Sequence, residues 1–417
     1  MGGGYNSAAS RFNRDFPQGV QEMISKTGND GRWQPVPNGL SQSNIGVKIK
    51  EQIAPNWYVI GDVNSGFDPY SLHFADGPKS LDDNNYVPLA NQTSNSDSSR
   101  SRWDNARAYV GVSNTTFGAL TAGRQYAFSN DLASAYDPTG GSYAFSLIGN
   151  SSTWGGGLGE TETARYNTSV KYQVTYNGFR AGVLAQVGGW QQGNGAKEAY
   201  QADIGGDFAG FSVDAVYSYA KDAVNLSSNT SGTPNGALKA TLADLNAGII
   251  GVKYKWQALT LFGGYEYARL SSPSDANDYL GHFYTLNGYT AKVGAADAYK
   301  DAKIQQVLWA GAKYAVLSNL DVMAGYYYGW QNNYDTGGAA ACGPNTKSAI
   351  AGAAPQGALN TDCAGRLEAV SGLVDWRPVK RVDIYSGVMV SHATGGIASG
   401  YIKNTATAFT SGLRVNF

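Results

Sequence analysis

Apolar and polar residues alternate with a period of two in many short stretches of the chain. Side chains on a β-strand point alternately to opposite faces, so each such stretch has one apolar and one polar face. In residues 211–219, for example, the odd positions are apolar or aromatic, whereas Ser212, Asp214 and Ser218 stand at even positions. Similar alternation occurs in residues 164–174, 320–330 and 409–417. The pattern predicts a chain built from β-strands.

About fifteen such strands follow one another, each close to the roughly 10 residues that a strand needs to cross a membrane. They are predicted near residues 44–53, 57–67, 106–114, 119–127, 164–176, 179–189, 199–208, 211–221, 246–255, 259–270, 304–316, 320–334, 366–377, 381–392 and 405–417. A stub at residues 1–5 adds a further candidate. Because single-chain bacterial barrels have even strand numbers, sixteen strands are expected.

The connections between these strands alternate between short turns and long loops. Short turns rich in Pro, Gly and Asn are predicted at residues 54–56, 176–178, 209–210, 318–319 and 378–380. Long loops are predicted near residues 6–40, 68–104, 128–163, 222–245, 271–303 and 335–365. This alternation indicates hairpins whose tight turns lie at one end of a barrel and whose long loops lie at the other.

The polar faces of the strands carry charge, which distinguishes a membrane barrel from a soluble sandwich. Arg165, Lys171 and Asp214 stand on polar rows of this kind. A soluble sandwich would turn its apolar faces to a shared core, whereas a membrane barrel turns them to lipid and surrounds a wet lumen. Aromatic residues gather at the strand ends, as in the girdles at lipid–water boundaries. We predict one all-β domain over residues 1–417, a transmembrane antiparallel β-barrel.

Composition agrees with this interpretation and narrows the function classes. Gly (54), Tyr (28) and Trp (9) are frequent, whereas Cys (2), Met (4) and His (3) are rare, which favours strands joined by turns. Mean hydropathy is −0.32, and no run reaches the roughly 18 apolar residues of a transmembrane helix. A net charge of −1 without blocks of Lys or Arg gives no indication of a nucleic-acid partner.

No motif in the chain indicates an enzyme or a required cofactor. His73, His282 and His392 lie far apart and have no partner motif. The glycines of residues 155–159 lack the Lys-Ser/Thr pair and the following helix of a phosphate loop. The Asp and Asn residues at 82–85 could hold Ca²⁺ in an extracellular loop, although a solvated loop is favoured. No other metal site is expected.

The two cysteines, Cys342 and Cys363, lie in one segment rich in Gly, Ala and Pro. No His accompanies them, and their spacing fits no metal knuckle. A loop disulfide formed in an oxidising compartment is favoured over two free thiols.

Four stretches resemble the general trimeric porins of the Gram-negative outer membrane, within a subgroup that has long loops and two loop cysteines. These are residues 43–48 with 57–67, residues 105–112 with 117–125, residues 136–145, and residues 412–417. The resemblance implies a sixteen-stranded barrel that assembles as a homotrimer among outer-membrane lipid and lipopolysaccharide. The terminal Phe417 looks like the signal that the barrel-assembly machinery reads.

The start of the chain departs from this family pattern. Residues 1–5 do not read as a signal peptide, so either a leader was removed or the chain starts late. The family's first strand is expected to be truncated here to about Gly4 and Tyr5, because the chain is shortened or its start is mis-assigned. Unpaired strand edges are costly in lipid. The alternative is that loop 6–40 folds back over the seam.

The resemblance also implies that the third long loop, residues 128–163, folds into the lumen and narrows it. Its acidic residues would face a basic wall across the pore, creating a transverse field that favours polar solutes. The acidic candidates are Asp131, Asp137, Glu160 and Glu162. The wall candidates, by strand parity, are Lys48, Lys50, Arg107, Arg124, Arg165, Lys171 and Arg180.

Several of these candidates have structural alternatives. Arg124 could instead bind a carboxylate at the base of the loop, and Asp137, which precedes Pro138, could initiate a turn. Glu160 and Glu162 could bond backbone amides. Leu120, Ala122 and Arg124 share one parity, so either a bulge intervenes or this strand does not face lipid.

The function predicted from these observations is passive diffusion of ions and small hydrophilic solutes. A substrate-specific channel for sugars or amino acids would need a ladder of lumen aromatics, and the candidates Tyr58, Tyr109 and Tyr327 are too scattered to indicate one. A plugged barrel that acts as an adhesin or structural protein is the third possibility. Lumen charges of both signs are similar in number, so the pattern predicts no ion preference.

Overall fold

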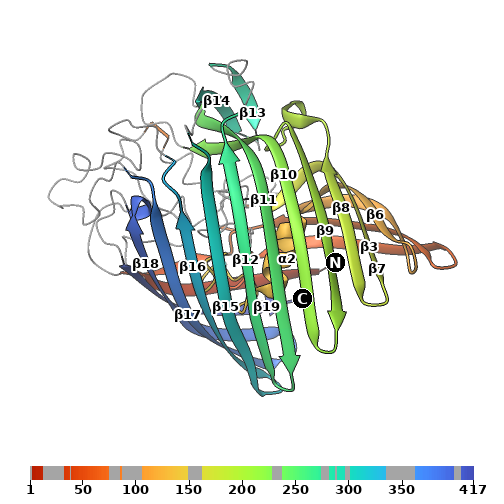
Figure 1. The fold of residues 1–417 in the computed structure, drawn as a ribbon. Coiled ribbons are helices and arrows are strands. Elements are labelled where there is room, and N and C mark those ends of the chain that lie inside the picture. Colours follow the sequence, from red (N-terminus) through yellow and green to blue (C-terminus); the bar gives the residue numbers. More distant parts are fainter. Residues whose placement is uncertain are drawn as a thin grey trace.

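A computed structural model describes most of the chain as one closed ring of antiparallel strands (Figure 1). The described residues are 2–12, 32–37, 39–74, 85–86, 106–148, 162–227, 237–273, 281–286, 289–295, 301–334, 362–398 and 405–417. Sixteen of the strands in this part of the chain form the ring. They are β1 (Gly2–Phe12), β3 (Asn44–Ala54), β4 (Trp57–Gly66), β5 (Arg107–Asn114), β6 (Gly118–Tyr126), β7 (Arg165–Tyr176), β8 (Phe179–Gln186), β9 (Glu198–Phe208), β10 (Phe211–Ser227), β11 (Leu238–Trp256), β12 (Leu259–Ser271), β15 (Lys303–Leu317), β16 (Leu320–Gln331), β17 (Gly365–Val379), β18 (Val382–Gly395) and β19 (Thr405–Asn416). Each strand hydrogen-bonds to its neighbours in this order, as the alternation of apolar and polar residues predicts.

The ring closes through β1, which corrects the prediction of a truncated first strand. β1 pairs with β19 from Gly4 opposite Asn416 to Phe12 opposite Ala408. At its other edge, residues 2–4 pair with residues 44–46 of β3. Residues 6–12, predicted to begin a long loop, therefore belong to the strand that fills the seam.

Three further strands lie outside the ring at the long-loop end. β2 (Arg32–Pro37) pairs with β1, and β13 (Phe283–Leu286) forms a hairpin with β14 (Tyr289–Ala295). β14 also adds in parallel to the extended end of β11 (Figure 1). The predicted loops 6–40, 222–245 and 271–303 thus contain strand. In residues 222–245 the strand belongs to β10 and β11, which continue well beyond the length that crosses a membrane.

The two faces of the ring differ in polarity as predicted. On β10, Val213 and Tyr217 are exposed on the outer surface, whereas Ser212 and Ser218 are buried on the lumen side. Trp57, Trp256 and Trp376, at the short-turn end, are among the exposed aromatics, which agrees with an interfacial girdle. In the described part of the chain, no helix has the length and apolar content needed to cross a membrane.

The pairing of β6 with β7 is irregular, and this irregularity changes the orientation of the first residues of β7. The register shifts between Gly123 and Gln125, and Thr168 opposite this point has a φ of 43°. A bulge of this kind changes which residues share a face. Tyr166, which stands on the apolar row of residues 164–174, is consequently buried inside. The extra residue lies on β7, so β6 itself keeps its parity, and Leu120, Ala122 and Arg124 share one face, on which Leu120 is exposed.

The hydrophobic core lies inside the ring. The short helix α2 (Phe128–Tyr136) enters the barrel directly after β6 (Figure 1). Its apolar side chains pack with Leu184, Ile249 and Trp309 of the inner wall, among others. A second cluster joins Phe145, from the segment after the helix, to Leu373 and Tyr385. One side of the lumen is therefore filled with packed side chains rather than water.

Candidate pore constriction

Helix α2 is tied to the inner wall at both of its ends. At the first turn, the backbone N–H of Phe128 donates to Oε1 of Gln201 on β9, at 2.7 Å. At the last turn, Nε1 of Trp309 on β15 donates to the carbonyl oxygen of Tyr136, at 3.0 Å. These two bonds hold the helix against the lumen face of the barrel, as the prediction of an inward-folded third loop requires.

Glycines of the inner wall make room for the aromatic side chains of the helix. A Cβ atom on Gly182 would lie 2.3 Å from Cζ of Phe128. A Cβ atom on Gly251 would lie 2.5 Å from Cγ of Tyr136. Both separations are far shorter than a van der Waals contact, so only glycine allows the rings to pack at this depth.

Asp137, at the end of the helix, organises the next turn of the loop. Its Oδ2 accepts bonds from the backbone N–H of Thr139 and of Gly141, at 2.9 and 2.8 Å, and from the Thr139 hydroxyl at 2.7 Å. Its Oδ1 accepts from the hydroxyls of Tyr327 and Ser146, at 2.6 and 3.1 Å. The side chain is only 1 % exposed, and burial raises its pKa.

Glu162 plays a similar part where the loop returns to the wall. Its Oε2 accepts bonds from Nε2 of Gln201 and Oγ of Ser218, at 3.2 and 2.8 Å. The residue is buried, and this burial raises its pKa. The prediction that Asp137 and Glu162 present charge to the open lumen is wrong, since both are buried in hydrogen-bonded positions. Glu160 lies outside the described residues.

Asp131 is the acidic residue of the loop that meets the predicted basic wall. Its Oδ2 lies 2.8 Å from Nζ of Lys171 on β7. The ammonium group also donates to the carbonyl oxygen of Tyr126 and lies 4.0 Å from the centroid of the Phe128 ring. Lys171 is mostly buried whereas Asp131 is half exposed, so this pair presents a carboxylate to the lumen and conceals its cation.

Arg180, on β8, is the centre of a larger ionic cluster beside the helix. Its Nε donates to Oδ1 of Asp214 at 2.9 Å, and its Nη1 forms an ion pair with Asp207. Tyr136 joins the cluster, because its hydroxyl donates to Oδ2 of Asp214 at 2.6 Å. One guanidinium therefore serves two carboxylates, and the cluster is acidic overall.

Three other predicted wall cations lie at β3 and β5. Lys48 and Arg107 share Asp62, with N–O distances of 4.0 and 3.2 Å. Nζ of Lys50 lies 4.5 Å from the centroid of the Tyr58 ring. In the described part of the chain, none of the three contacts an acidic residue of the third long loop (residues 128–163), which we call the constriction loop.

Arg124 and Arg165 lie next to the irregular pairing of β6 and β7. Arg124 is opposite Ala108, on the outward-facing row of β5, and its Nη1 donates to Oδ1 of Asn167. The prediction that Arg124 lines the pore is therefore wrong, because the register turns it away from the lumen. Cζ of Arg165 lies 5.4 Å from the centroid of the Tyr126 ring.

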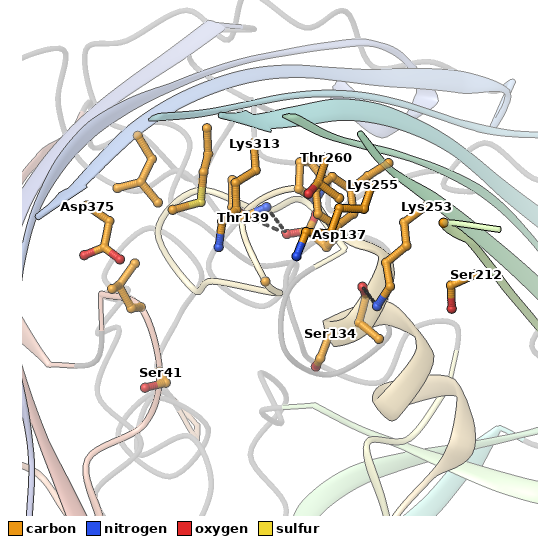
Figure 2. A pocket seen from close by; sticks show the side chains of 18 of the residues that line it. Ser41, Ser134, Asp137, Thr139, Ser212, Lys253, Lys255, Thr260, Lys313 and Asp375 are labelled. Atoms are coloured by element: carbon orange, nitrogen blue, oxygen red, sulfur yellow. Dashed lines mark hydrogen bonds between the residues drawn. The ribbon is translucent and has the colours of Figure 1, made fainter. Parts of the chain in front are cut away.

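Two cavities border the constriction loop. The larger, of about 870 Å³, is shown in Figure 2. It opens towards the short turns, since Ala209 and Gly210 of the β9–β10 turn line it. The smaller, of about 640 Å³, lies between helix α2 and β6–β10, and its charged lining includes Asp131, Asp203 and Arg180. The loop thus divides the lumen into charged compartments.

The larger cavity is lined by five cations that the sequence analysis did not select as constriction residues. They are Lys253, Lys255, Lys313, Arg377 and Arg414. Strand parity could have found Lys253 and Lys255, since Val252 and Tyr254 alternate with them on β11. The selection favoured strands near the third loop in sequence, whereas the ring brings distant strands to the same cavity.

Carboxylates neutralise most of these cations. The described ion pairs are Lys313–Asp321 at 3.0 Å, Arg377–Asp321 at 2.9 Å, Arg377–Asp375 at 3.0 Å and Arg414–Asp383 at 2.8 Å. The transverse arrangement of a basic wall against an acidic loop is therefore only partly present. Most charges are paired along the wall, between neighbouring strands.

Two predictions concern loops of which little is described. Cys363 is buried and disulfide-bonded, while Cys342 lies outside the described residues. Of the candidate Ca²⁺ segment at residues 82–85, only Asn85 is described, and its Nδ2 donates to the carbonyl oxygen of Ala237 at 3.4 Å.

Comparison with solved structures places the fold among porins. An anion-selective porin from Comamonas acidovorans is 13 % identical, with a TM-score of 0.62, covering 100 % of this chain and 98 % of that one. The trimer form of OmpT from Vibrio cholerae is 14 % identical, with a TM-score of 0.59 and coverage of 100 % and 98 %. Salmonella typhi OmpF, in complex with daunomycin, is 17 % identical, with a TM-score of 0.52 and coverage of 100 % and 97 %. At these identities the likeness shows the fold alone.

Comparison at the level of sequence families identifies the chain more directly. No curated protein matches it. The family described as Gram-negative porin matches residues 18–354, which is most of the chain. The family match agrees with three features of the structure: a closed ring of strands, a polar lumen and an inward-folded loop. The chain belongs to the Gram-negative porins, and it is an outer-membrane β-barrel channel rather than an enzyme.

Proposed function

We propose that this porin mediates passive diffusion of ions and small hydrophilic solutes, and that residues 128–148 set the size limit. The observation that carries the proposal is the attachment of this segment across the lumen. Gln201, Trp309 and Tyr327 hold it from three different strands. The cavities that it leaves, of about 870 and 640 Å³, are lined by charged and hydroxyl-bearing side chains suited to hydrated solutes.

The test is reconstitution of the full chain into planar bilayers and into liposomes. We expect ohmic conductance, and swelling rates that fall steadily from monosaccharides to trisaccharides without saturation. Saturation by one sugar or amino acid would instead indicate a substrate-specific channel. Absence of both conductance and swelling from correctly folded protein would contradict the diffusion proposal and favour a plugged barrel.

We also propose that the protein is a homotrimer embedded in lipid and lipopolysaccharide, assembled through its C-terminal residue. A trimer form of a structural neighbour supports the oligomeric state. The C-terminal side chain, Phe417, is exposed after the last strand, where an assembly receptor could bind it. Native mass spectrometry of protein extracted from membranes should show three copies. Phe417→Ala should lower the amount of folded protein in the outer membrane, and unchanged assembly would contradict this part of the proposal.

A further inference from the structure

Lys253 and Lys255 stand on the lumen face of β11, beside the constriction loop (Figure 2). Nζ of Lys253 donates to the carbonyl oxygen of Ala135 at 3.4 Å and lies 5.0 Å from the centroid of the Tyr136 ring. A carbonyl oxygen and a ring face attract a cation but do not neutralise its charge. Both ammonium groups therefore bring their full charge to the cavity.

Neither lysine has a carboxylate partner among the described residues. The other cations of the cavity differ, because Lys313, Arg377 and Arg414 each contact a carboxylate within 3.0 Å. Lys255 donates no side-chain hydrogen bond in the described part of the chain. The pair is thus a local excess of positive charge rather than part of the paired network on the neighbouring strands.

The carboxylates that share this cavity are already engaged. Asp207 forms an ion pair with Arg180, and Asp137 is buried under five donors from its own loop and β16. Asp375 and Asp383 pair with Arg377 and Arg414. Asp207 still attracts Lys253 electrostatically from the acidic side of the Arg180 cluster, whereas Lys255 lines only the larger cavity and has no such neighbour among the described residues. The positive field is therefore strongest at Lys255, where it favours an incoming anion.

Hydroxyl groups complete the surroundings of the two lysines. Thr260 is opposite Lys255 on β12, and Ser212 is opposite Lys253 on β10. Both hydroxyls line the same cavity (Figure 2). The Ser212 hydroxyl is already engaged with Tyr136 and Arg180, so Thr260 supplies the hydroxyl donor beside Lys255. Ammonium and hydroxyl donors on one concave surface match the acceptor-only chemistry of an oxyanion.

We propose that Lys253 and Lys255 form a transient binding site for small oxyanions, such as inorganic phosphate or a short carboxylate, on the short-turn side of the constriction. The site rests on the proposed diffusion function and adds an ion selectivity to it: the channel prefers anions. Its affinity is weak, because conduction requires that a bound ion leave as readily as it enters.

The experiment measures single-channel conductance in KCl while inorganic phosphate is added, together with the reversal potential in a KCl gradient. Wild-type protein should show phosphate-dependent reduction of the chloride current and a reversal potential on the anion side. The double variant Lys253→Gln with Lys255→Gln should raise the half-blocking phosphate concentration about tenfold, since it removes two charge-assisted donors, and should shift reversal towards cations. Lys253→Arg with Lys255→Arg should keep both properties.

The matched control is Lys48→Gln with Lys50→Gln, because these lysines are also two residues apart on one strand but line neither cavity. We expect this control to change phosphate block less than about twofold. Equal effects of the two double variants, or no phosphate block in a conducting wild-type channel, would overturn the oxyanion site. Absence of conductance in the wild type would instead count against the diffusion proposal.

Discussion

At the scale of single residues, the constriction depends on buried carboxylates whose hydrogen bonds hold the loop. Asp137 accepts five bonds, and Glu162 accepts two from the opposite side of the loop. An acceptor with this many donors is hard to replace, because each donor left unpaired in a buried site costs free energy. The charges that shape the lumen and the charges that build the loop are therefore different residues.

Asp137→Asn should loosen the constriction loop. The amide nitrogen places donors where an oxygen now accepts bonds from Thr139 and Gly141, so we expect a loss of about 1–3 kcal/mol in local stability. Single-channel records should show larger and noisier conductance than the wild type. The control is Asp131→Asn, which removes the half-exposed carboxylate of the same loop. Equal noise in the two variants would contradict a structural role for Asp137.

Glu162→Gln should change how stability depends on pH. The folded-state pKa of Glu162 is raised by burial, so the stability that its protonated form contributes is present below the unfolded pKa of about 4.3 and is lost as pH rises through the folded pKa. Gln does not titrate. In thermal unfolding followed from about pH 4 to pH 8, the wild type should lose more stability than the variant. Parallel pH profiles would show that Glu162 does not titrate in this way.

At the scale of elements, the loop and the wall fit by shape as well as by hydrogen bonds. Helix α2 packs its aromatic rings onto inner-wall glycines, and the neighbouring strands supply hydrogen-bonding side chains to both of its ends. A barrel with larger wall residues at these positions would leave no room for the helix, because protein interiors are close-packed.

Gly251→Ala tests this fit. A Cβ atom at this position would lie 2.5 Å from Cγ of Tyr136, so we expect the helix to shift into the lumen and conductance to fall. Gly248→Ala on the same strand is the matched control, since its Cβ would meet nothing within 4 Å. The swelling assay with disaccharides should separate the two variants. Equal swelling rates would mean that the wall adapts to the added methyl group without moving the helix.

At the scale of the whole molecule, ring closure by β1 is the condition for stability in lipid. An open seam would expose the backbone groups of β3 and β19 to hydrocarbon, where each unsatisfied group costs several kcal/mol. Deleting residues 2–12 should therefore abolish the heat-modifiable, folded form on cold gels. Deleting residues 283–295, which form the hairpin outside the ring, should leave that form intact. A folded barrel lacking residues 2–12 would contradict the role of β1.

Much of the ring could be predicted from sequence, and the misses are physically informative. The bounds of β4, β9 and β12 fall within one residue of their predictions, because alternation is set by exposure of each strand to lipid on one face. Residues 6–12 were not recognised as strand because Asn, Ser and Ala carry little apolar signal, although they belong to β1. Arg124 was misplaced although its parity was readable, because β6 is regular and places Arg124 on the same outward face as Leu120 and Ala122; the bulge on β7 instead turned Tyr166 inward.

The sequence by itself determined the class of this protein: alternating strands, short turns at one end, aromatic strand ends and a charged lumen row all follow from local exposure to lipid or water. Only the tertiary structure decided which charges act in the pore. Asp137 and Glu162 became buried anchors, whereas Lys253 and Lys255 were left without carboxylate partners in the described residues. Pairing between charges depends on strand register and on which part of the inner wall the constriction loop contacts. The period of a single strand specifies neither of these.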